Sequence, residues 1–272
     1  MTQTDKSLEE LRSWFTAHPK ALVAFSGGVD SCLVAFLARK FLGKDNAIAV
    51  ISDSPSLKRS DLDDAHRFCD THDIRLHVID AGEINDPNYR NNPIDRCFHC
   101  KTALYHTMQG LLENGYAGFE LLNGANRNDQ GDYRPGMKAA GQHSVLSPLL
   151  ECGVDKEGVR ALARSMGLFT WDKPASPCLS SRFPYGEAIS LEKLEMVERG
   201  EEYLKSLGFS DCRVRFRDSE ATLEVPQDEV EKLTSVFATT ETHFLQIGFK
   251  GVRIDPEGLV SGKLNRGVIR GH

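Results

Sequence analysis

An apolar segment that leads directly into a glycine-rich turn constrains this chain more than any other feature. Residues Ala21–Phe25 have the pattern of a buried strand, Ser26–Ser31 read Ser-Gly-Gly-Val-Asp-Ser, and an apolar helical pattern begins near Cys32. Gly27 and Gly28 let the backbone approach an anion and permit positive φ angles, while hydroxyls and the amides at a helix N-terminus supply donors. A strand, turn and helix in this order predict a phosphate-binding loop.

The residue types in the turn indicate a nucleotide polyphosphate bound together with Mg²⁺. The turn differs from the Walker loop, which has a lysine before its hydroxyl residue and four residues between its glycines. Asp30 stands where that loop has a positive charge, so Mg²⁺ is the natural bridge between this carboxylate and phosphate oxygens. A plain turn between a strand and a helix is the alternative, but it requires none of the polar residues. The predicted phosphate ligands are Ser26, Gly27, Gly28, Asp30 and Ser31.

Short apolar runs alternate with helical patterns over the first two-thirds of the chain. The predicted strands are Ala21–Phe25, Ala47–Ile51, Arg75–Ile79 and Glu120–Asn123. The predicted helices are Ser31–Phe41, Ser60–His72, Lys101–Asn114 and Asp155–Met166. This alternation predicts an α/β fold with a doubly wound parallel sheet, in which ligands bind at the carboxyl ends of the strands.

Polar residues follow two of the other predicted strands and are therefore expected at the same edge of the sheet. Asp53 follows the second strand and is placed to contact the nucleoside. The loop 123–136 follows the fourth strand; its Gly124 permits a close approach to a nucleotide, and Asp129 and Asp132 can hold Mg²⁺ or bind ribose. A loop rich in Asn, Asp and Gly needs no function, but its position favours one.

A stretch rich in Pro and Ser, Trp171–Gly186, separates the predicted sheet domain from a smaller one. We expect a first domain over residues 1–186 and a second over 187–272, the latter binding substrate or forming oligomer contacts. The second domain has the pattern of a small α+β unit. Its predicted elements are the helices Leu191–Leu207 and Gln227–Ser235 and the strands Cys212–Arg217, Ala221–Val225 and His243–Phe249.

Composition and charge exclude several classes of protein. The 272 residues carry 33 basic and 39 acidic side chains, and a net charge of −6 gives no overall attraction for nucleic acid. No apolar run is long enough for a membrane helix, and the first residues lack an apolar signal core. They instead predict a helix with Ser7 and Glu10 as a capping box, and Leu8, Leu11, Trp14 and Phe15 on its apolar face. We expect a cytoplasmic protein whose seven cysteines are not a disulfide framework.

Cys97 and Cys100 form a Cys-x-x-Cys pair at a turn that enters a predicted helix. Two thiolates at this spacing can bind one metal centre, and a helix N-terminus favours the thiolate form. Zinc would ordinarily require a second such pair, which the remaining cysteines do not supply. A thioredoxin-like redox pair is disfavoured because a polar loop precedes it rather than a strand. Two incidental cysteines remain the simplest alternative.

Cys178 lies in the segment Pro-Ala-Ser-Pro-Cys-Leu-Ser-Ser-Arg-Phe-Pro-Tyr-Gly, 174–186, which has few apolar neighbours. We therefore expect an accessible thiol, with Arg182 close enough to favour the thiolate and to contact substrate. Cys32, Cys69 and Cys212 occupy apolar faces and are expected in the core, where most free cysteines lie. Cys152 is left without a role.

Three arginines, Arg213, Arg215 and Arg217, alternate along a predicted strand and so share one face. Guanidinium groups in a line suit phosphate or carboxylate recognition, and Arg213 and Arg215 are the candidates for binding substrate. An exposed face balanced by Glu201, Glu202 and Glu224 is an equal alternative.

The Ser26–Ser31 turn resembles the signature of the PP-loop ATP pyrophosphatases, which implies cleavage of ATP between its α- and β-phosphates. Together with the 123–136 loop and the 174–186 segment, it resembles the LarE family of ATP-dependent sulfur transferases over nearly the full length. The resemblance implies ATP and Mg²⁺ as cofactors and pyridinium biscarboxylic acid mononucleotide, a small carboxylated nucleotide, as the substrate. It makes Cys178 the catalytic sulfur donor, which some members sacrifice to dehydroalanine.

Members of the family that carry all three cysteines, here Cys97, Cys100 and Cys178, are associated with a 4Fe-4S cluster. Three thiolates leave one iron open for an extra sulfide, which would make the enzyme catalytic rather than single-turnover. We also expect a homo-oligomer. A tRNA-thiolating enzyme, an ammonia-using amide synthetase and a non-enzymatic nucleotide-binding module remain as alternatives. The first should show a basic surface, and the second should not need Cys178.

Overall fold

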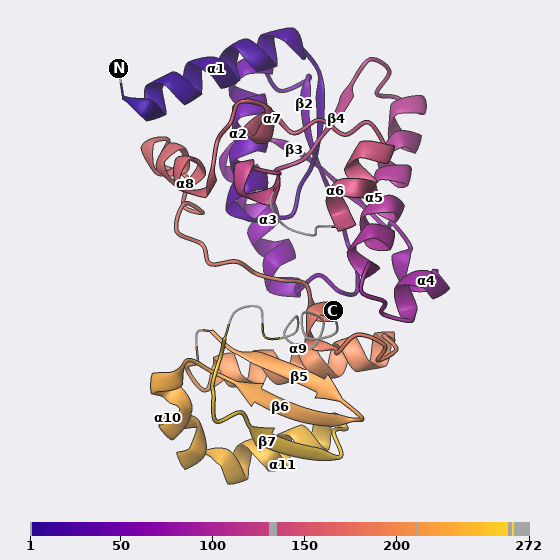
Figure 1. Ribbon diagram of the computed structural model, residues 1–272, viewed down its shortest axis with the longest axis vertical. Helices are drawn as coiled ribbons and strands as arrows, with labels where there is room; N and C mark the ends of the chain where they lie inside the picture. Colours follow the sequence, from indigo (N-terminus) through magenta and orange to yellow (C-terminus); the bar gives the residue numbers. More distant parts are fainter. Residues whose placement is uncertain (1, 131–134, 210, 261–262, 264–272) are drawn as a thin grey trace. The chain divides into compact units, whose positions relative to one another are not determined.

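The computed structural model describes residues 2–130, 135–209, 211–260 and 263. The chain forms two compact units, and each has its own sheet (Figure 1). The first unit comprises Met1–Glu83 and Asp95–Ser176, and the second comprises Ile84–Ile94 and Pro177–His272. The domain limits expected from the sequence stay a prediction, because a compact unit defined by contacts need not fold separately. Within the described part of the chain, no helix is long and apolar enough to cross a membrane.

The first unit is built on a parallel sheet, as the sequence predicted. Its four strands lie in the order β3-β2-β1-β4, and every neighbouring pair is parallel. One of the two inner strands, β1, leads into the Ser-Gly-Gly turn. The strands are β1 (Ala21–Ala24), β2 (Ala47–Ser52), β3 (Arg75–Ile79) and β4 (Glu120–Leu122).

Helices cover both faces of this sheet, which confirms the doubly wound arrangement (Figure 1). Side chains alternate along the strands, so that Val23 and Ala49 join one core while Leu22 and Ile48 join the other. Helices α1, α2, α3 and α8 pack on the first core, and α5 and α6 pack on the second. The helices are α1 (Gln3–Ala17), α2 (Val29–Leu42), α3 (Arg59–Thr71), α5 (Arg96–Glu113), α6 (Pro135–Gln142), α7 (Pro148–Glu151) and α8 (Lys156–Ser165). Short 3₁₀ turns, η1 (Glu83–Asn85) and η2 (Arg127–Gln130), follow β3 and β4.

The predicted start of the first helix was wrong, although its apolar face was right. Helix α1 begins at Gln3, and Thr2 and Asp5 form the capping box that was expected at Ser7 and Glu10. Ser7 is buried within the helix instead. Both Ser/Thr-x-x-Asp/Glu spacings occur in this segment, and the earlier one adds a full turn to the helix.

The second unit is the small α+β arrangement that the sequence predicted. Its sheet has the order β5-β6-β7, with β5 and β6 antiparallel and β6 and β7 parallel. The strands are β5 (Arg213–Arg217), β6 (Glu220–Glu224) and β7 (Gly251–Ile254). The helical elements are α4 (Pro87–Arg90), η3 (Leu179–Arg182), α9 (Leu191–Ser206), η4 (Gln227–Glu229), α10 (Val230–Ser235) and α11 (Phe237–Ile247).

The last predicted strand, His243–Phe249, is wrong. Most of this segment belongs to helix α11, and the strand β7 begins only after Gly248, whose φ of 122° ends the helix. The buried residues Thr240, Phe244 and Ile247 recur at helical spacing, but the run is short enough for a strand to fit as well. Tertiary packing decides, because Phe244 lies where a Cβ on Gly200 of α9 would come within 2.8 Å of its ring.

Candidate functional site

The phosphate-binding loop is organised by the two serines that bracket it. The Ser31 hydroxyl accepts a hydrogen bond from the Ser26 amide at 3.1 Å, lies 3.1 Å from the Ser26 hydroxyl and donates to the Gly28 carbonyl at 3.1 Å. Gly27 has φ of 70°, a conformation that glycine adopts without strain. Gly28 is the N-cap of α2 and supplies no capping side chain, so the first amides of this 14-residue helix can bind an anion.

Gly124 lets the loop after β4 pack directly on the first turn of α2. A Cβ at this position would lie 2.8 Å from the Ser31 amide nitrogen and 3.0 Å from the Asp30 carbonyl carbon. The close approach is therefore between two backbone segments of the protein. The predicted contact between Gly124 and ATP stays a prediction, but the glycine brings the two loops of the phosphate site together.

Asn126 joins the two carboxylates that were predicted to hold Mg²⁺. Its side-chain amide donates to Asp30 Oδ1 at 2.8 Å, and its backbone amide donates to Asp129 Oδ2 at 3.0 Å. Burial raises the pKa of Asp30; the hydrogen bond from Asn126 opposes this rise and the charge of Asp129 adds to it. Two crowded carboxylates beside a phosphate loop suit Mg²⁺, which is commonly bound by one or two carboxylates plus phosphate oxygens. Asp132 lies outside the described residues.

The carboxyl end of β2 is held by a network that the sequence alone did not reveal. Arg59, at the start of α3, forms an ion pair with Asp53 and donates to the Ser54 carbonyl at 3.0 Å. The Ser54 hydroxyl is bonded to the buried carboxylate of Glu83 and to the Ser56 hydroxyl. Asp53 remains 43% exposed, so its carboxylate is accessible at the edge where the nucleoside was expected.

Lys173 also contacts the phosphate loop, and this role was not predicted from the sequence. Its ammonium lies 3.0 Å from a carboxylate oxygen of both Asp61 and Asp64 on α3, and 3.4 Å from the Gly27 carbonyl. Burial opposes the charge on Lys173, but the hydrogen bonds to Asp64 and Asp61 outweigh it and raise its pKa. The lysine therefore links the Gly27 carbonyl of the phosphate loop to two carboxylates of α3. A single lysine in a Pro-rich segment carries no sequence signal for this role.

The seven cysteines separate into buried and accessible groups largely as expected. Cys32, Cys69 and Cys212 are buried, and burial raises the pKa of Cys32 and of Cys69 to about 12. Cys152 is half-buried, and its pKa is raised to about 11, again mainly by burial. Cys178 is exposed. None of the seven forms a disulfide.

Cys97 and Cys100 lie near the start of α5, which belongs to the first unit, whereas Cys178 belongs to the second. Cys97 is exposed and Cys100 is half-buried, so both thiols remain chemically accessible to some degree. In the ranges that the structure describes, no three side chains of His, Cys, Asp or Glu gather as a metal-binding group.

Arg182 lies beside the backbone of Cys178 but is removed from solvent, which the sequence did not predict. Its guanidinium is completely buried and forms a two-pronged ion pair with Glu201, at 2.7 and 2.9 Å. The remaining nitrogen donates to the Pro177 and Cys178 carbonyls, at 2.7 and 3.0 Å, and to the Ser181 hydroxyl. These contacts hold the backbone of the Cys178 loop (residues 177–186) rather than its thiol.

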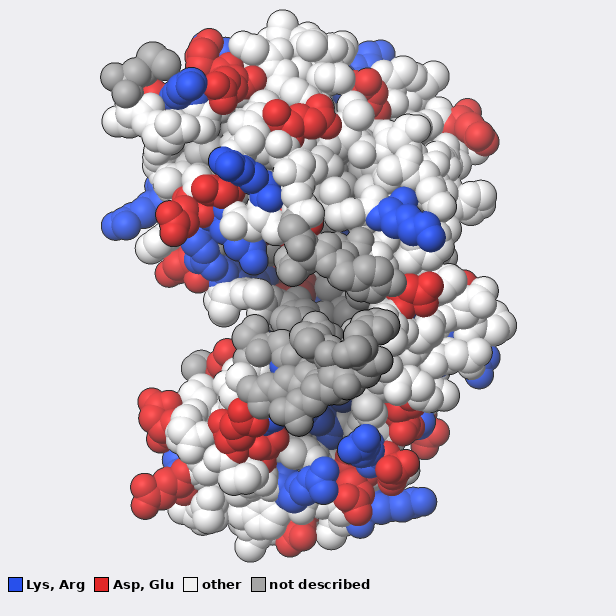
Figure 2. All heavy atoms as spheres, in the orientation of Figure 1, with Lys and Arg blue, Asp and Glu red and all other residues white. Residues whose placement is uncertain are grey.

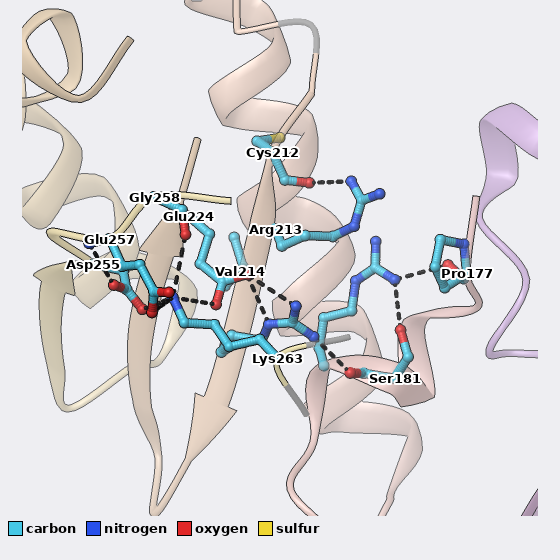
Figure 3. Close-up of polar contacts among 12 residues, drawn as sticks. Pro177, Ser181, Cys212, Arg213, Val214, Glu224, Asp255, Glu257, Gly258 and Lys263 are labelled. Carbon is cyan, nitrogen blue, oxygen red and sulfur yellow. Dashed lines mark hydrogen bonds and ion pairs between the residues drawn. The ribbon is translucent and has the colours of Figure 1, made fainter. Parts of the chain in front are cut away.

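Two arginines of β5 are balanced by carboxylates. Arg213 contacts Asp211 at 2.7 Å, and Arg215 contacts the buried Glu224 at 2.9 Å and donates to the Ser181 carbonyl at 2.8 Å. Figure 3 shows Arg213 bonded to the Cys212 carbonyl and Lys263 beside Glu224. Lys263 also approaches Glu224, at 3.6 Å. Both interpretations of the arginine stripe are thus compatible with the structure: Arg215 is paired with Glu224, and the stripe still concentrates positive charge beside the Cys178 loop.

Figure 2 shows how charge is distributed over one face of the molecule. On the face seen in Figure 2, acidic and basic side chains are interspersed over each unit. A basic band, which a protein that binds RNA through phosphate contacts should present, is absent from the described part of that face.

Comparison with known proteins identifies the relatives of this chain. The NAD synthase family model matches residues 7–92, which include the phosphate-binding loop. A protein of Synechocystis is 43% identical over 96% of this chain and 98% of its own length. The pyridinium-3,5-bisthiocarboxylic acid mononucleotide synthase of Lactiplantibacillus plantarum is 34% identical over 90% of this chain and 89% of its own length. A component of the glutamine-hydrolysing GMP synthase of Thermoplasma acidophilum is 26% identical over 66% of this chain and 61% of its own length.

Some of these relatives match only part of this chain, whereas others match it over nearly the full length. The NAD synthase model matches the region that contains the ATP loop, and the GMP synthase similarity covers two-thirds of the chain, whereas the similarity to the bisthiocarboxylic acid mononucleotide synthase runs through both units. With 34% identity along nine-tenths of its length, and with the parallel sheet, phosphate loop and exposed cysteine described above, this chain is an enzyme of the LarE family, the family of that synthase.

Proposed function

We propose that this enzyme uses ATP to activate a carboxylate of pyridinium-3,5-biscarboxylic acid mononucleotide and converts it to a thiocarboxylate. The relative that shows the family is named for the bisthiocarboxylic acid product. The observation that carries the proposal here is Cys178: it is exposed, and the loop that bears it is held through backbone groups. Its thiol can therefore leave without loss of the contacts that shape the loop.

In the first step, an oxygen of the substrate carboxylate attacks the α-phosphorus of ATP, and pyrophosphate leaves. Ser26, Gly27, Gly28 and Ser31 would bind the β- and γ-phosphates through amides and hydroxyls, and Asp30 and Asp129 would hold Mg²⁺. Bound Mg²⁺ supplies positive charge that stabilises the departing pyrophosphate. Asp53 and Gly124 complete the proposed ATP site. Lys173 would stabilise the loop through its hydrogen bond to the Gly27 carbonyl.

In the second step, the Cys178 thiolate attacks the acyl carbon, and AMP leaves with its bonding electrons. The product is a thioester between Cys178 and the substrate. A base then removes the Cα proton of Cys178, the Cβ–S bond breaks, and sulfur remains on the substrate as a thiocarboxylate. The protein is left with dehydroalanine at this position. Each event consumes one ATP and one cysteine sulfur, so the atoms balance without an external oxidant or reductant.

Arg213 and Arg215 are the proposed ligands of the substrate phosphate or of its second carboxylate. Both lie on the β5 face, and Arg215 already contacts the Cys178 loop at the Ser181 carbonyl. Arg182 contributes differently, because a completely buried guanidinium bonded to Glu201 is placed to hold the loop rather than to meet a ligand.

A 4Fe-4S cluster on Cys97, Cys100 and Cys178 is the second proposed source of sulfur. Cys97 and Cys178 are exposed, which is consistent with ligation, but no three-residue ligand set is gathered among the residues that the structure describes. We also propose a homo-oligomer in the cytoplasm, which light scattering and cell fractionation would test.

The decisive experiment is anaerobic purification with iron and sulfide analysis, then intact-mass measurement after reaction with ATP and the substrate. If Cys178 is the donor, iron is absent and the protein loses the elements of hydrogen sulfide as AMP and pyrophosphate appear. Iron with an unchanged protein mass supports the cluster route. Cys152→Ala, at another partly accessible cysteine, is the matched control for Cys178→Ala. Full thiocarboxylate formation by Cys178→Ala would exclude sulfur transfer through this residue and favour an amide-forming relative.

A further inference from the structure

A short segment between β3 and α5 is fastened to the loop that carries Cys178. Residues 84–94, here called the strap, belong to the second unit, although the residues on both sides of it belong to the first. The hydroxyl of Tyr89 in the strap lies 2.6 Å from that of Ser180, two residues after Cys178. Tyr89 and Ser180 are both buried, with at most 1% of either residue exposed.

Asn92 makes the second attachment between the strap and the loop. Its side-chain amide donates to the Pro184 carbonyl at 2.8 Å, and its own carbonyl accepts from the Gly186 amide at 2.9 Å. Asn92 is completely buried, and its φ of 50° lies in the left-handed region, where Asn and Gly are the residues best tolerated. The Arg90 carbonyl adds a further bond, from the Ile189 amide at 2.8 Å.

The Cys178 loop is thus held at both of its ends inside the second unit. Arg182, which is paired with Glu201, donates to the carbonyls of Pro177 and Cys178, while the strap holds Ser180 and the residues from Pro184 onward. An irregular loop ordinarily retains much conformational freedom, and ordering it costs about 1–2 kcal/mol per residue. Buried polar contacts at both ends offset that cost. The Cys178 thiol is therefore exposed on a loop whose backbone is held in place.

We propose that Tyr89 and Asn92 are positioning residues for sulfur transfer: the strap fixes the conformation of the Cys178 loop so that the thiol meets the activated substrate. The inference rests on the proposed function. Attack on an acyl carbon needs the reacting atoms within about 3–3.5 Å and correctly aligned, so a loosened loop slows this step. The ATP loop lies in the first unit and shares none of these contacts, so activation of the carboxylate should proceed unchanged.

The test compares Tyr89→Phe and Asn92→Gly with the wild-type enzyme in a single turnover. Tyr89→Phe removes one hydroxyl, and Asn92→Gly removes the amide while permitting the φ of 50°. We expect thiocarboxylate formation to slow about tenfold in each variant, the loss expected for one or two hydrogen bonds, while pyrophosphate release and the KM for ATP stay within about twofold. Tyr116→Phe, which removes a hydroxyl bonded to His77 in the first unit, is the matched control and should leave both steps unchanged.

A double-mutant cycle separates positioning from a general loss of stability. Ser180→Ala and Tyr89→Phe break the same contact, so the double variant should be no slower than the more affected single variant. Additive losses, or parallel loss of pyrophosphate release and thiocarboxylate formation, would overturn the inference.

Hydrogen exchange gives a measurement that does not depend on catalysis. The amides of Gly186 and Ile189 donate to the strap, so they should exchange about tenfold faster in Asn92→Gly and retain wild-type rates in Tyr116→Phe. Unchanged exchange in both strap variants would contradict the inference. If the wild-type enzyme makes no thiocarboxylate, the proposed function fails, and the exchange comparison still decides whether the strap orders the loop.

Discussion

The phosphate loop in the first unit and the Cys178 loop in the second perform consecutive steps of the proposed reaction, but they are stabilised in different ways. In the phosphate loop, Ser26, Gly28 and Ser31 bond to one another within six consecutive residues. In the Cys178 loop, the principal partners are Tyr89, Asn92 and Glu201, and Tyr89 lies 91 residues from Ser180 in the sequence. The first loop is closed by hydrogen bonds within itself, and distant residues such as Lys173 and Asn126 add support from outside. The second loop depends on distant chain segments for most of the contacts that hold it.

This difference matches the chemical demands on each loop. Phosphates are bound largely by backbone amides at a helix N-terminus, which any correctly shaped glycine-rich turn can present. A thiol that must meet one carbon atom has to be placed to within a fraction of an ångström, and an irregular loop reaches that precision only through supporting contacts.

The largest effect should come from Cys178→Ala, which should stop the step assigned to the Cys178 loop and leave the step assigned to the phosphate loop intact. Thiocarboxylate formation should fall by at least about 1000-fold because the sulfur nucleophile is removed, while pyrophosphate release continues. The loop is held through backbone groups, so the midpoint of thermal unfolding should change little. Product analysis with parallel calorimetry measures both. A large drop in thermal stability would show that the thiol itself supports the loop.

The next largest effect is expected on breaking the buried ion pair of the Cys178 loop. Arg182→Leu removes the guanidinium that is paired with the buried Glu201, which should lower the free energy of unfolding by about 3–5 kcal/mol. Urea denaturation measures this change. Arg12→Ala is the control, because its ion pair with Glu9 is more than half exposed and contributes less than about 1 kcal/mol. Equal losses of stability in the two variants would contradict the prediction that the Cys178 loop depends on its buried ion pair.

Gly124→Ala tests the corresponding contact of the phosphate loop. The new Cβ would lie 2.8 Å from the Ser31 amide nitrogen, so the two loops must separate, at a cost of about 1–3 kcal/mol, and ATP binding should weaken about tenfold. Calorimetric titration with ATP and Mg²⁺ measures the binding. Gly110→Ala is the matched control, because this glycine lies inside α5 with no atom in reach of a Cβ, and alanine there should stabilise the helix. Unchanged ATP affinity in Gly124→Ala would place the nucleotide elsewhere.

The smallest effect concerns the dependence of stability on pH at Asp30. Burial raises the folded-state pKa of Asp30 above its ordinary 3.8, so stability falls as pH rises from 3.8 through the folded pKa. Asp30→Asn removes that loss and should raise the midpoint of thermal unfolding by about 2–4 °C at about pH 7, but not at about pH 3. It should also abolish binding of ATP with Mg²⁺. Thermal scans without ligand at the two pH values provide the measurement.

Asp61 provides a comparison of opposite sign within the same unit. Burial opposes its charge, but hydrogen bonds from Ser176 and Lys173 outweigh burial and lower the pKa of Asp61. Its stabilising contribution is therefore present above pH 3.8 and is lost as pH falls through the lowered folded pKa. Asp61→Asn should lower the thermal midpoint at neutral pH and change it little below the folded pKa. The same sign for both variants would contradict the assignment of Asp30 as the destabilised carboxylate.

Elements with strong periodicity were predictable from the sequence. The short apolar strands of the parallel sheet alternate with helical patterns, and the phosphate loop follows from consecutive residues. The segment 243–249 was not predictable, because a short run with several apolar side chains fits a strand or a buried helix equally well. Packing of Phe244 against Gly200 selected the helix.

The same limit applies to the candidate site. Cys178 was recognised as exposed from its polar surroundings, and Cys32, Cys69 and Cys212 as buried from their apolar faces. The burial of Arg182 could not be predicted, because a charged side chain is buried only where the fold provides a partner of opposite charge, here Glu201. The contributions of Lys173, Tyr89 and Asn92 are likewise invisible until distant segments are brought together.

The sequence by itself determined the α/β architecture, the phosphate loop and the exposure of Cys178, because these follow from local periodicity and from residues adjacent in the chain. The tertiary structure alone decided how the Cys178 loop is held, which carboxylates lie beside Asp30, and which arginine is removed from solvent. Those features depend on hydrogen bonds and ion pairs between segments far apart in sequence, and such pairs leave no periodic signal in either partner.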